Sequence, residues 1–208
     1  MTGSVGNDFP ALAADVAGNW YVAYSSLTKD GSQAWLASSS DGKSWREPVA
    51  ITSGIGNALF PWIVAGDAGH VAIAWYGSAT PGNSNDAKAM KDAVWNVEIA
   101  TSFDALSAAP RFATARVTGS PMHAGTISTH GLDPTDPSAP DRSLGDFFTI
   151  ALDPQGRVNV AYERSLDGAA NLEWTRIEGL SLYASGAAPA LPTPSSGLLP
   201  VTPPSPLP

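Results

Sequence analysis

The chain has 208 residues and no cysteine, which excludes disulfides and thiolate metal sites. With 43% hydrophobic residues it has the composition of a globular protein, and no apolar run approaches the ~18 residues of a membrane-spanning helix. The net charge of −8 and the eleven scattered Lys and Arg residues argue against nucleic-acid binding.

Three stretches of the chain repeat one pattern, at residues 9–24, 60–75 and 147–162. Each begins with a Phe nine residues before a Gly and closes on an Ala followed by a large aromatic residue. Two short β-rich runs joined by a Gly turn predict a hairpin, and a hairpin repeated in an all-β chain indicates propeller blades. We therefore expect an all-β fold of about three four-stranded blades.

Outer strands are expected after each hairpin. They are predicted at residues 33–38 and 48–52 in the first blade, 94–101 and 111–117 in the second, and 172–177 and 180–183 in the third. The polar stretch 80–91 lengthens one loop of the second blade. A longer polar segment, residues 121–145, precedes the third hairpin and is a candidate functional loop.

The predicted organisation is an N-terminal lead-in (1–8), the blades (9–185) and a linker or tail rich in Pro, Ser and Thr (186–208). Closed propellers use ~4–8 blades, so we expect part of a six-bladed ring. Alternatively, three-blade chains could associate with one another, or the open edges of the sheets could be tolerated. No leader is visible at the start, and we expect the chain to begin inside a longer protein.

The segment Ser39-Ser40-Asp41-Gly42-Lys43-Ser44-Trp45 follows the third strand of the first blade. Ser39 and Asp41 can cap backbone N–H groups of a tight turn, Gly42 can supply a positive φ, and Trp45 can pack on the blade. This segment resembles the Asp-box of the sialidase superfamily, as found in bacterial neuraminidase repeats, although one residue between Asp41 and Gly42 is missing. The resemblance implies a structural role for the box.

Other segments are similar to secreted bacterial sialidase-like proteins with such repeats. They are Phe60-Pro61-Trp62, Pro121-Met122-His123-Ala124-Gly125 and Asp141-Arg142-Ser143-Leu144-Gly145-Asp146-Phe147-Phe148. The resemblance covers roughly residues 9–184. It implies a sialidase-type propeller, located outside the cell or at its surface, that binds glycans or hydrolyses glycosides.

The catalytic set of sialidases is not recognisable in this chain. That set comprises three Arg residues, a Tyr nucleophile paired with Glu, and an Asp acid/base, and the family's Arg-Ile-Pro motif is absent. Tyr162-Glu163-Arg164 offers a Tyr next to a Glu. However, Tyr162 repeats the position of Tyr24 and Trp75, which indicates core packing, and neighbouring strand residues point to opposite faces.

The best candidate cluster is His123, Asp141, Arg142 and Asp146, at the two ends of the 121–145 loop. Arg142 could bind a ligand carboxylate, and the two aspartates could act as acid/base groups. Alternatively, Arg142 could bridge the aspartates and only fix the loop.

No cofactor is required, but Ca²⁺ is possible. It could bind Asp141 and Asp146 with loop oxygens. Asp133, Asp136 and Asp141 offer a weaker Ca²⁺ site, because they do not match an EF-hand loop.

Trp62 replaces a small residue, Ala11, of the first copy and could present its ring to a sugar.

The sequence thus predicts a sialidase-like propeller whose intact parent binds or cleaves extracellular glycans. Autonomous sialidase activity is not expected, and whether the protein is an enzyme stays open. The alternative is a non-enzymatic propeller that serves as a scaffold or adhesion module. Expected partners are an extracellular glycan and the missing blades of the same protein, with no nucleic acid and no membrane span.

Overall fold

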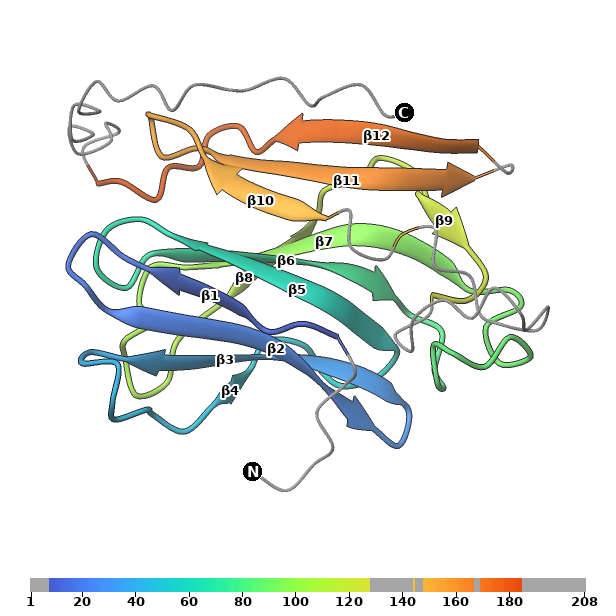
Figure 1. The fold of residues 1–208 in the computed structure, drawn as a ribbon, viewed down its shortest axis with the longest axis horizontal. Coiled ribbons are helices and arrows are strands. Elements are labelled where there is room, and N and C mark those ends of the chain that lie inside the picture. The colour runs from blue at the N-terminus through green and yellow to red at the C-terminus, as the bar shows by residue number, and fades with distance from the viewer. Residues whose placement is uncertain (1–7, 128–143, 145–147, 167–168, 185–208) are drawn as a thin grey trace, which may run out of the picture.

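A computed structural model describes residues 8–127, 144, 148–166 and 169–184. These residues form strands joined by turns and loops, without a helix (Figure 1). The strands are β1 (Ala11–Ala14), β2 (Trp20–Thr28), β3 (Gly31–Ser39), β4 (Val49–Ala50), β5 (Asn57–Ala65), β6 (Val71–Ser78), β7 (Val94–Ser102), β8 (Ala113–Arg116), β9 (His123–Ala124), β10 (Thr149–Leu152), β11 (Val158–Leu166) and β12 (Ala169–Arg176).

Three successive antiparallel meanders make up the fold. Strands β1-β2-β3-β4 form the first blade, β5-β6-β7-β8 the second, and β10-β11-β12 the third. The repeated stretches give the inner hairpins, which pair in the same register: Leu12 lies opposite Val22, Ile63 opposite Ile73, and Ile150 opposite Val160. The predicted all-β blade architecture is confirmed, whereas a ring of six blades stays a prediction.

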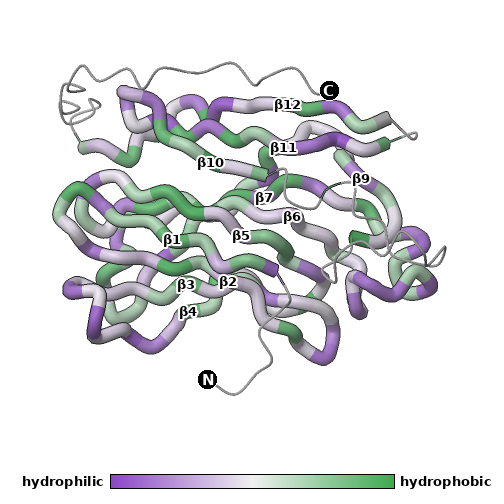
Figure 2. Tube along the Cα trace, viewed as in Figure 1, coloured by the Kyte–Doolittle hydropathy of each residue, from purple (hydrophilic) through white to green (hydrophobic). Residues whose placement is uncertain are grey.

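The blades pack face to face, and alternate residues of a strand point to opposite faces, so the second blade contributes to two cores. In β6, Trp75 and Ile73 enter the core between the first and second blades. Tyr76 and Ala74 enter the core between the second and third blades. We call the face of a blade that turns toward the next blade in the chain its leading face, and the opposite one its trailing face. Many hydrophilic residues lie in the turns and loops at the strand ends (Figure 2).

Two elements differ from the prediction for the third blade. Residues 180–183, expected as its fourth strand, are not a strand. Their backbone crosses two hairpin turns instead: Leu182 N donates to Gly156 O (2.9 Å), and Asp67 N donates to Leu182 O (2.9 Å). The short strand β9 was not predicted. It pairs antiparallel with β7 and parallel with β11, so it joins the second and third blades into one sheet.

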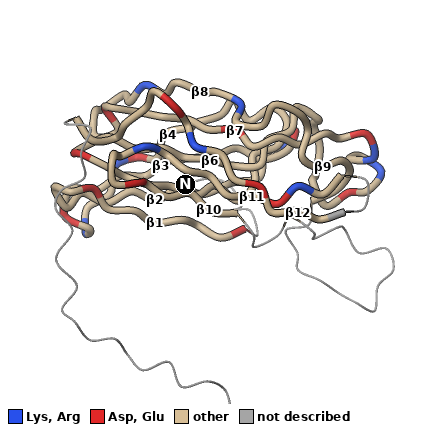
Figure 3. Tube along the Cα trace, turned by 90° about the horizontal axis from the view of Figure 1, so that it is seen from above, with Lys and Arg blue, Asp and Glu red and all other residues tan. Residues whose placement is uncertain are grey.

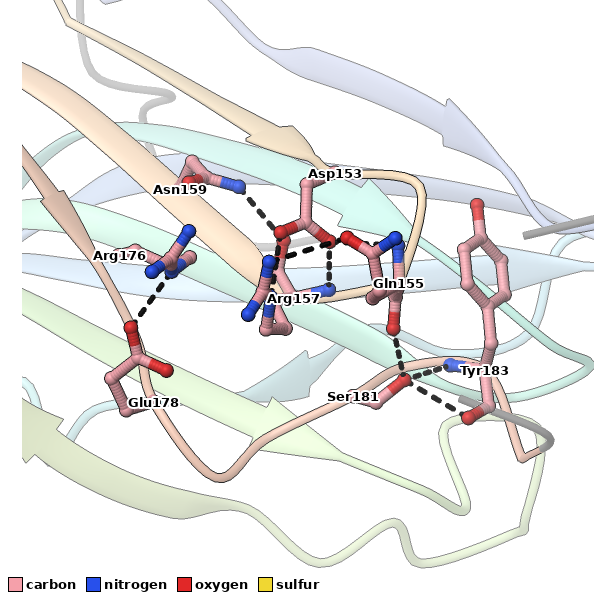
Figure 4. Close-up of polar contacts among 8 residues, drawn as sticks. All are labelled: Asp153, Gln155, Arg157, Asn159, Arg176, Glu178, Ser181 and Tyr183. Atoms are coloured by element: carbon pink, nitrogen blue, oxygen red, sulfur yellow. Dashed lines mark hydrogen bonds and ion pairs between the residues drawn. The ribbon is translucent and has the colours of Figure 1, made fainter. Parts of the chain in front are cut away.

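The inner hairpin turns of the first and third blades are closed by aspartate side chains. In the third blade Asp153 Oδ1 accepts the N–H groups of Gln155 and Arg157, each at 2.9 Å. Its Oδ2 accepts Arg157 Nε–H at 2.7 Å (Figure 4). Ser181 Oγ donates to Gln155 O at 2.8 Å and so holds the C-terminal segment against this turn. The first blade repeats the device with Asp15.

Charged side chains of both signs are interspersed over the described part (Figure 3). No helix in that part is long and apolar enough to cross a membrane. Residues 1–7 and 185–208 lie outside it, so the predicted lead-in and tail stay predictions.

Candidate functional site

Most of the predicted cluster lies outside the described residues: Asp141, Arg142 and Asp146, together with Asp133 and Asp136. Only His123 is described. Its ring is 2% exposed, with Nδ1 3.2 Å from Ser165 O and Nε2 2.9 Å from Thr126 O. In this position the imidazole fixes β9 between the blades, and a role for it at a site stays a prediction.

Tyr162 lies in the core between the second and third blades, 4% exposed. Its hydroxyl donates to Glu173 Oε2 on β12 at 2.9 Å, so its carboxylate partner is not the adjacent Glu163. Arg164 Nε lies 3.8 Å from the other oxygen of Glu173. Burial raises the pKa of Tyr162, and the hydrogen bond to Glu173 adds to that rise. A phenol in this state is a packing residue and a poor nucleophile.

The turn at Ser39–Trp45 is closed by its own side chains. Ser39 Oγ accepts Gly42 N–H (2.9 Å) and donates to Asp41 Oδ1 (3.0 Å). Asp41 Oδ1 also accepts the N–H groups of Ser44 (2.7 Å) and Lys43 (2.8 Å). These backbone hydrogen bonds lower the pKa of Asp41 to about 2. Gly42 has φ +68°.

Trp45 differs from the expectation that it packs on the blade. Its side chain is 44% exposed and stands at the rim of a groove that also contains Val22 and Tyr24. The hydrogen-bonded part of the turn, from Ser39 to Ser44, therefore closes without burying Trp45. Assignment of this segment to the Asp-box family rests on the resemblance alone.

Replacing Ser39 by alanine should lower the free energy of unfolding by about 1 kcal/mol, because the N–H of Gly42 loses its acceptor. Urea denaturation followed by Trp fluorescence would measure this. Ser40→Ala, at an exposed neighbouring position, is the matched control and should leave stability unchanged. Equal effects of the two substitutions would contradict a closing role for Ser39.

A second turn uses the same pair of side chains. Ser102 Oγ donates to Asp104 Oδ1 (3.0 Å), and Arg111 supplies the further donors, with Arg111 N 2.9 Å from Asp104 Oδ1. The Gly and Trp of the first segment are missing here. Ser102-Phe103-Asp104 thus keeps the hydrogen-bonding half of the pattern.

A groove of about 400 Å³ runs between the inner strands of the first two blades. Trp62 of β5 lines one side and is 39% exposed. The other side is residues 9–12, in which Phe9 and Leu12 are 67% and 60% exposed. A β-bulge between Leu59 and Trp62 shifts the register of β5 here, with Phe60 at φ +52°, a conformation that non-Gly residues rarely adopt.

A buried carboxyl group stands next to this groove. Asp8 directly precedes the groove residues and is 8% exposed. Its Oδ2 accepts the N–H of Phe60 at 2.7 Å, and its Oδ1 has no hydrogen-bond partner among the described residues. Ser25 lies close, but its hydroxyl donates to Ala58 O at 2.7 Å. Burial raises the pKa of Asp8, and the hydrogen bond from the Phe60 N–H offsets only part of that rise.

Asp8 was missed in the sequence, although a signal existed. The pair Asp8-Phe9 opens the first copy just as Asp146-Phe147 opens the third. The second copy has Leu59-Phe60 there, and it is the Phe60 amide that Asp8 binds.

The groove and Asp8 together combine an aromatic surface with a carboxyl group that retains its proton to higher pH than usual. An exposed indole offers a flat apolar face with a polar N–H. A carboxyl group with a raised pKa can donate a proton or a hydrogen bond. Among the described residues no three His, Cys, Asp or Glu side chains gather as a metal site. Ca²⁺ therefore stays a prediction for the loop aspartates.

No protein-family model matches the sequence, and no curated protein matches it significantly. Among solved structures, Zg3597, a family 117 glycoside hydrolase of the marine bacterium Zobellia galactanivorans, is similar with a TM-score of 0.47 and 14% identity. Trypanosoma rangeli sialidase is similar with a TM-score of 0.39 and 11% identity. The alignments cover 84% and 86% of this chain, but 52% and 32% of those chains. This chain thus spans about half the length of the first protein and a third of the second.

Proposed function

We propose that this chain is the glycan-binding part of a secreted sialidase-like propeller, and that the sugar binds in the groove at Trp62. The observation that carries the proposal is the exposed Trp62 ring on a groove of about 400 Å³, beside the buried carboxyl group of Asp8. The resemblance of the repeats to sialidase-like proteins supports a glycan as the ligand class. Arg142 and Asp141 are proposed to complete the site from the 121–145 loop.

Binding is proposed for this chain, and hydrolysis only for an intact ring. Glycosidases need two reacting groups, commonly two carboxylates or, in sialidases, a Tyr with a Glu. Tyr76 and Tyr162 are 0% and 4% exposed, and burial raises the pKa of both. The remaining groups would have to come from residues outside the described part or from the blades that complete the ring.

Asp8→Asn should change how the stability of the protein depends on pH. A carboxyl group whose pKa is raised on folding lowers the free energy of unfolding as pH rises from near 3.9 through its folded pKa. The amide cannot ionise, so this decline should disappear in the variant. At pH 7 the variant should therefore be more stable than the parent. Urea denaturation between pH 4 and pH 8 would measure it.

Sugar binding should fall in the same Asp8→Asn variant, and more strongly in Trp62→Ala. Calorimetric titration with sialyllactose and with lactose would measure affinity, and a fluorogenic sialoside would report hydrolysis. Trp20→Ala is the control, because Trp20 is 38% exposed but lies outside the groove. If neither sugar binds, or if Trp62→Ala binds like the parent, the site is wrong and the scaffold alternative is favoured.

A further inference from the structure

The third blade exposes residues that the first two blades bury. Trp174 lies opposite Ala161 across the β11–β12 ladder, in the position that Leu36 and Ile99 hold in the first and second blades. Leu36 is 1% exposed and Ile99 3%, because the next blade covers their leading faces. Trp174 is 61% exposed. The leading face of the third blade therefore lacks the cover that its two counterparts have.

The neighbouring position shows the same contrast. Leu172 lies opposite Glu163, as Val97 lies opposite Tyr76. Val97 is 0% exposed, whereas Leu172 is 76% exposed. Two large apolar side chains thus stand together on an open sheet face, which is uncommon on a soluble surface without a partner.

The trailing face of the first blade is also open, because no preceding blade covers it. Leu12 holds the position of Ile63 and Ile150 in the other inner strands. Ile63 is 5% exposed and Ile150 6%, since each packs on the preceding blade, whereas Leu12 is 60% exposed. The first and third blades are the two ends of the stack in Figure 1, so each end has one open face.

The open leading face of the third blade and the open trailing face of the first blade are the two kinds of face that pack together at both internal interfaces of the chain. In both internal interfaces a leading face packs on a trailing face. The shapes at the open ends also match. Trp174 is larger than Leu36 and Ile99, and the trailing face of the first blade carries a groove of about 440 Å³ that could receive it. The residues lining this groove are Pro10, Val22, Tyr24, Ala37, Trp45, Arg46, Glu47 and Pro48.

We propose that a second copy of this chain covers both faces, so that two chains close head to tail into a six-bladed ring. The leading face around Trp174 of each copy packs on the trailing face around Leu12 of the other. A head-to-tail contact that closes after two copies leaves no open blade face, and six blades lie within the ~4–8 of closed propellers. The proposal does not rest on glycan binding, although Leu12 also lines the groove at Trp62, so the second copy would border that groove.

Sedimentation velocity of the full chain should give twice the chain mass of 21.4 kDa. Trp174→Asp and Leu12→Asp should each give the single mass, because each places a charge in both contacts of the ring. Ile55→Asp is the matched control: Ile55 is 74% exposed in the β4–β5 loop, outside both faces, and the variant should stay at twice the mass. Circular dichroism would check that the variants remain folded.

Mixing the two monomeric variants gives the sharpest test. In a pair of one Trp174→Asp chain and one Leu12→Asp chain, both substitutions fall in the same contact and the other contact is intact. The mixture should therefore recover pairs that neither variant forms alone. A parent chain that sediments as a monomer or as a larger polymer would overturn the proposal, and so would a mixture that stays monomeric. None of these readouts involves a sugar, so the two proposals can fail separately.

Discussion

Replacing Asp15 by alanine is expected to lower the free energy of unfolding by about 3 kcal/mol, the largest effect of any polar substitution proposed for the chain. Asp15 is 6% exposed in the β1–β2 turn. Its Oδ1 accepts the N–H groups of Ala17 (2.9 Å) and Asn19 (3.0 Å). Its Oδ2 accepts the Tyr21 hydroxyl (2.7 Å) and the N–H of Gly69 in the second blade (3.1 Å). Alanine would leave the buried Tyr21 hydroxyl without this acceptor and remove one of the two acceptors of the Gly69 N–H, which weakens the contact between two blades.

Asp153→Ala is the matched control, since Asp153 holds the same place in the third copy. Its acceptor bonds go to Gln155 and Arg157 within its own turn. The control should therefore lose less stability than Asp15→Ala in urea denaturation. If the two variants lost the same amount, the bonds from Asp15 to Tyr21 and Gly69 would contribute no more than the ion pair between Asp153 and Arg157.

Asp15 also determines how the stability of the protein should change at acid pH. Burial alone would raise its pKa, but the hydrogen bonds from Tyr21, Asn19 and Gly69 outweigh burial and lower it. A carboxylate with a lowered folded pKa contributes stability above its unfolded pKa near 3.9, and that stability is lost as pH falls through the folded pKa. The stability difference between the parent and Asp15→Ala should therefore shrink below pH 4, which acid titrations of both proteins would measure.

The repeated hairpins could be predicted because local sequence determines them. Alternating apolar residues around Gly18, Gly69 and Gly156 fix both the strands and their faces, and all three hairpins form in one register. Residues 180–183 have a similar apolar composition but form no strand. Their backbone bonds to Gly156 and Asp67 in two distant turns, and such long-range pairing leaves no local signal.

The candidate site was harder to predict, because it depends on contacts between blades. Trp62 stood out as a large residue in place of Ala11 and is indeed exposed on a groove. Asp8 takes its burial and raised pKa from Phe60, fifty-two residues later in the chain, so no local pattern reveals it. His123 has the chemistry of a catalytic residue, yet its ring nitrogens contact two backbone carbonyl groups.

Replacing Gly31 by alanine should destabilise the fold by about 3–5 kcal/mol, since it combines backbone strain with a steric clash. Gly31 begins β3 with φ +139° and forms a bridge with Gly56 of the β4–β5 connection. A Cβ at Gly31 would overlap the carbonyl oxygen of Gly56 and lie 2.7 Å from its carbonyl carbon. The same oxygen accepts the N–H of Ser32 at 3.0 Å. Backbone atoms cannot rotate away as a side chain can, so the first blade would have to move from the second.

Two further glycines separate the causes of this effect. Gly119→Ala should be neutral, because its Cβ would meet no atom within 4 Å. Gly18 has φ +86°, and a Cβ there would meet no atom within 4 Å. Gly18→Ala should therefore show the backbone strain alone, about 1–2 kcal/mol. Thermal unfolding should therefore rank the variants Gly119→Ala, Gly18→Ala, Gly31→Ala in order of increasing loss. If Gly31→Ala and Gly18→Ala had the same melting temperature, the backbones of Gly31 and Gly56 would not be in contact. The blades would then be held together by their apolar cores, without close backbone packing at this end.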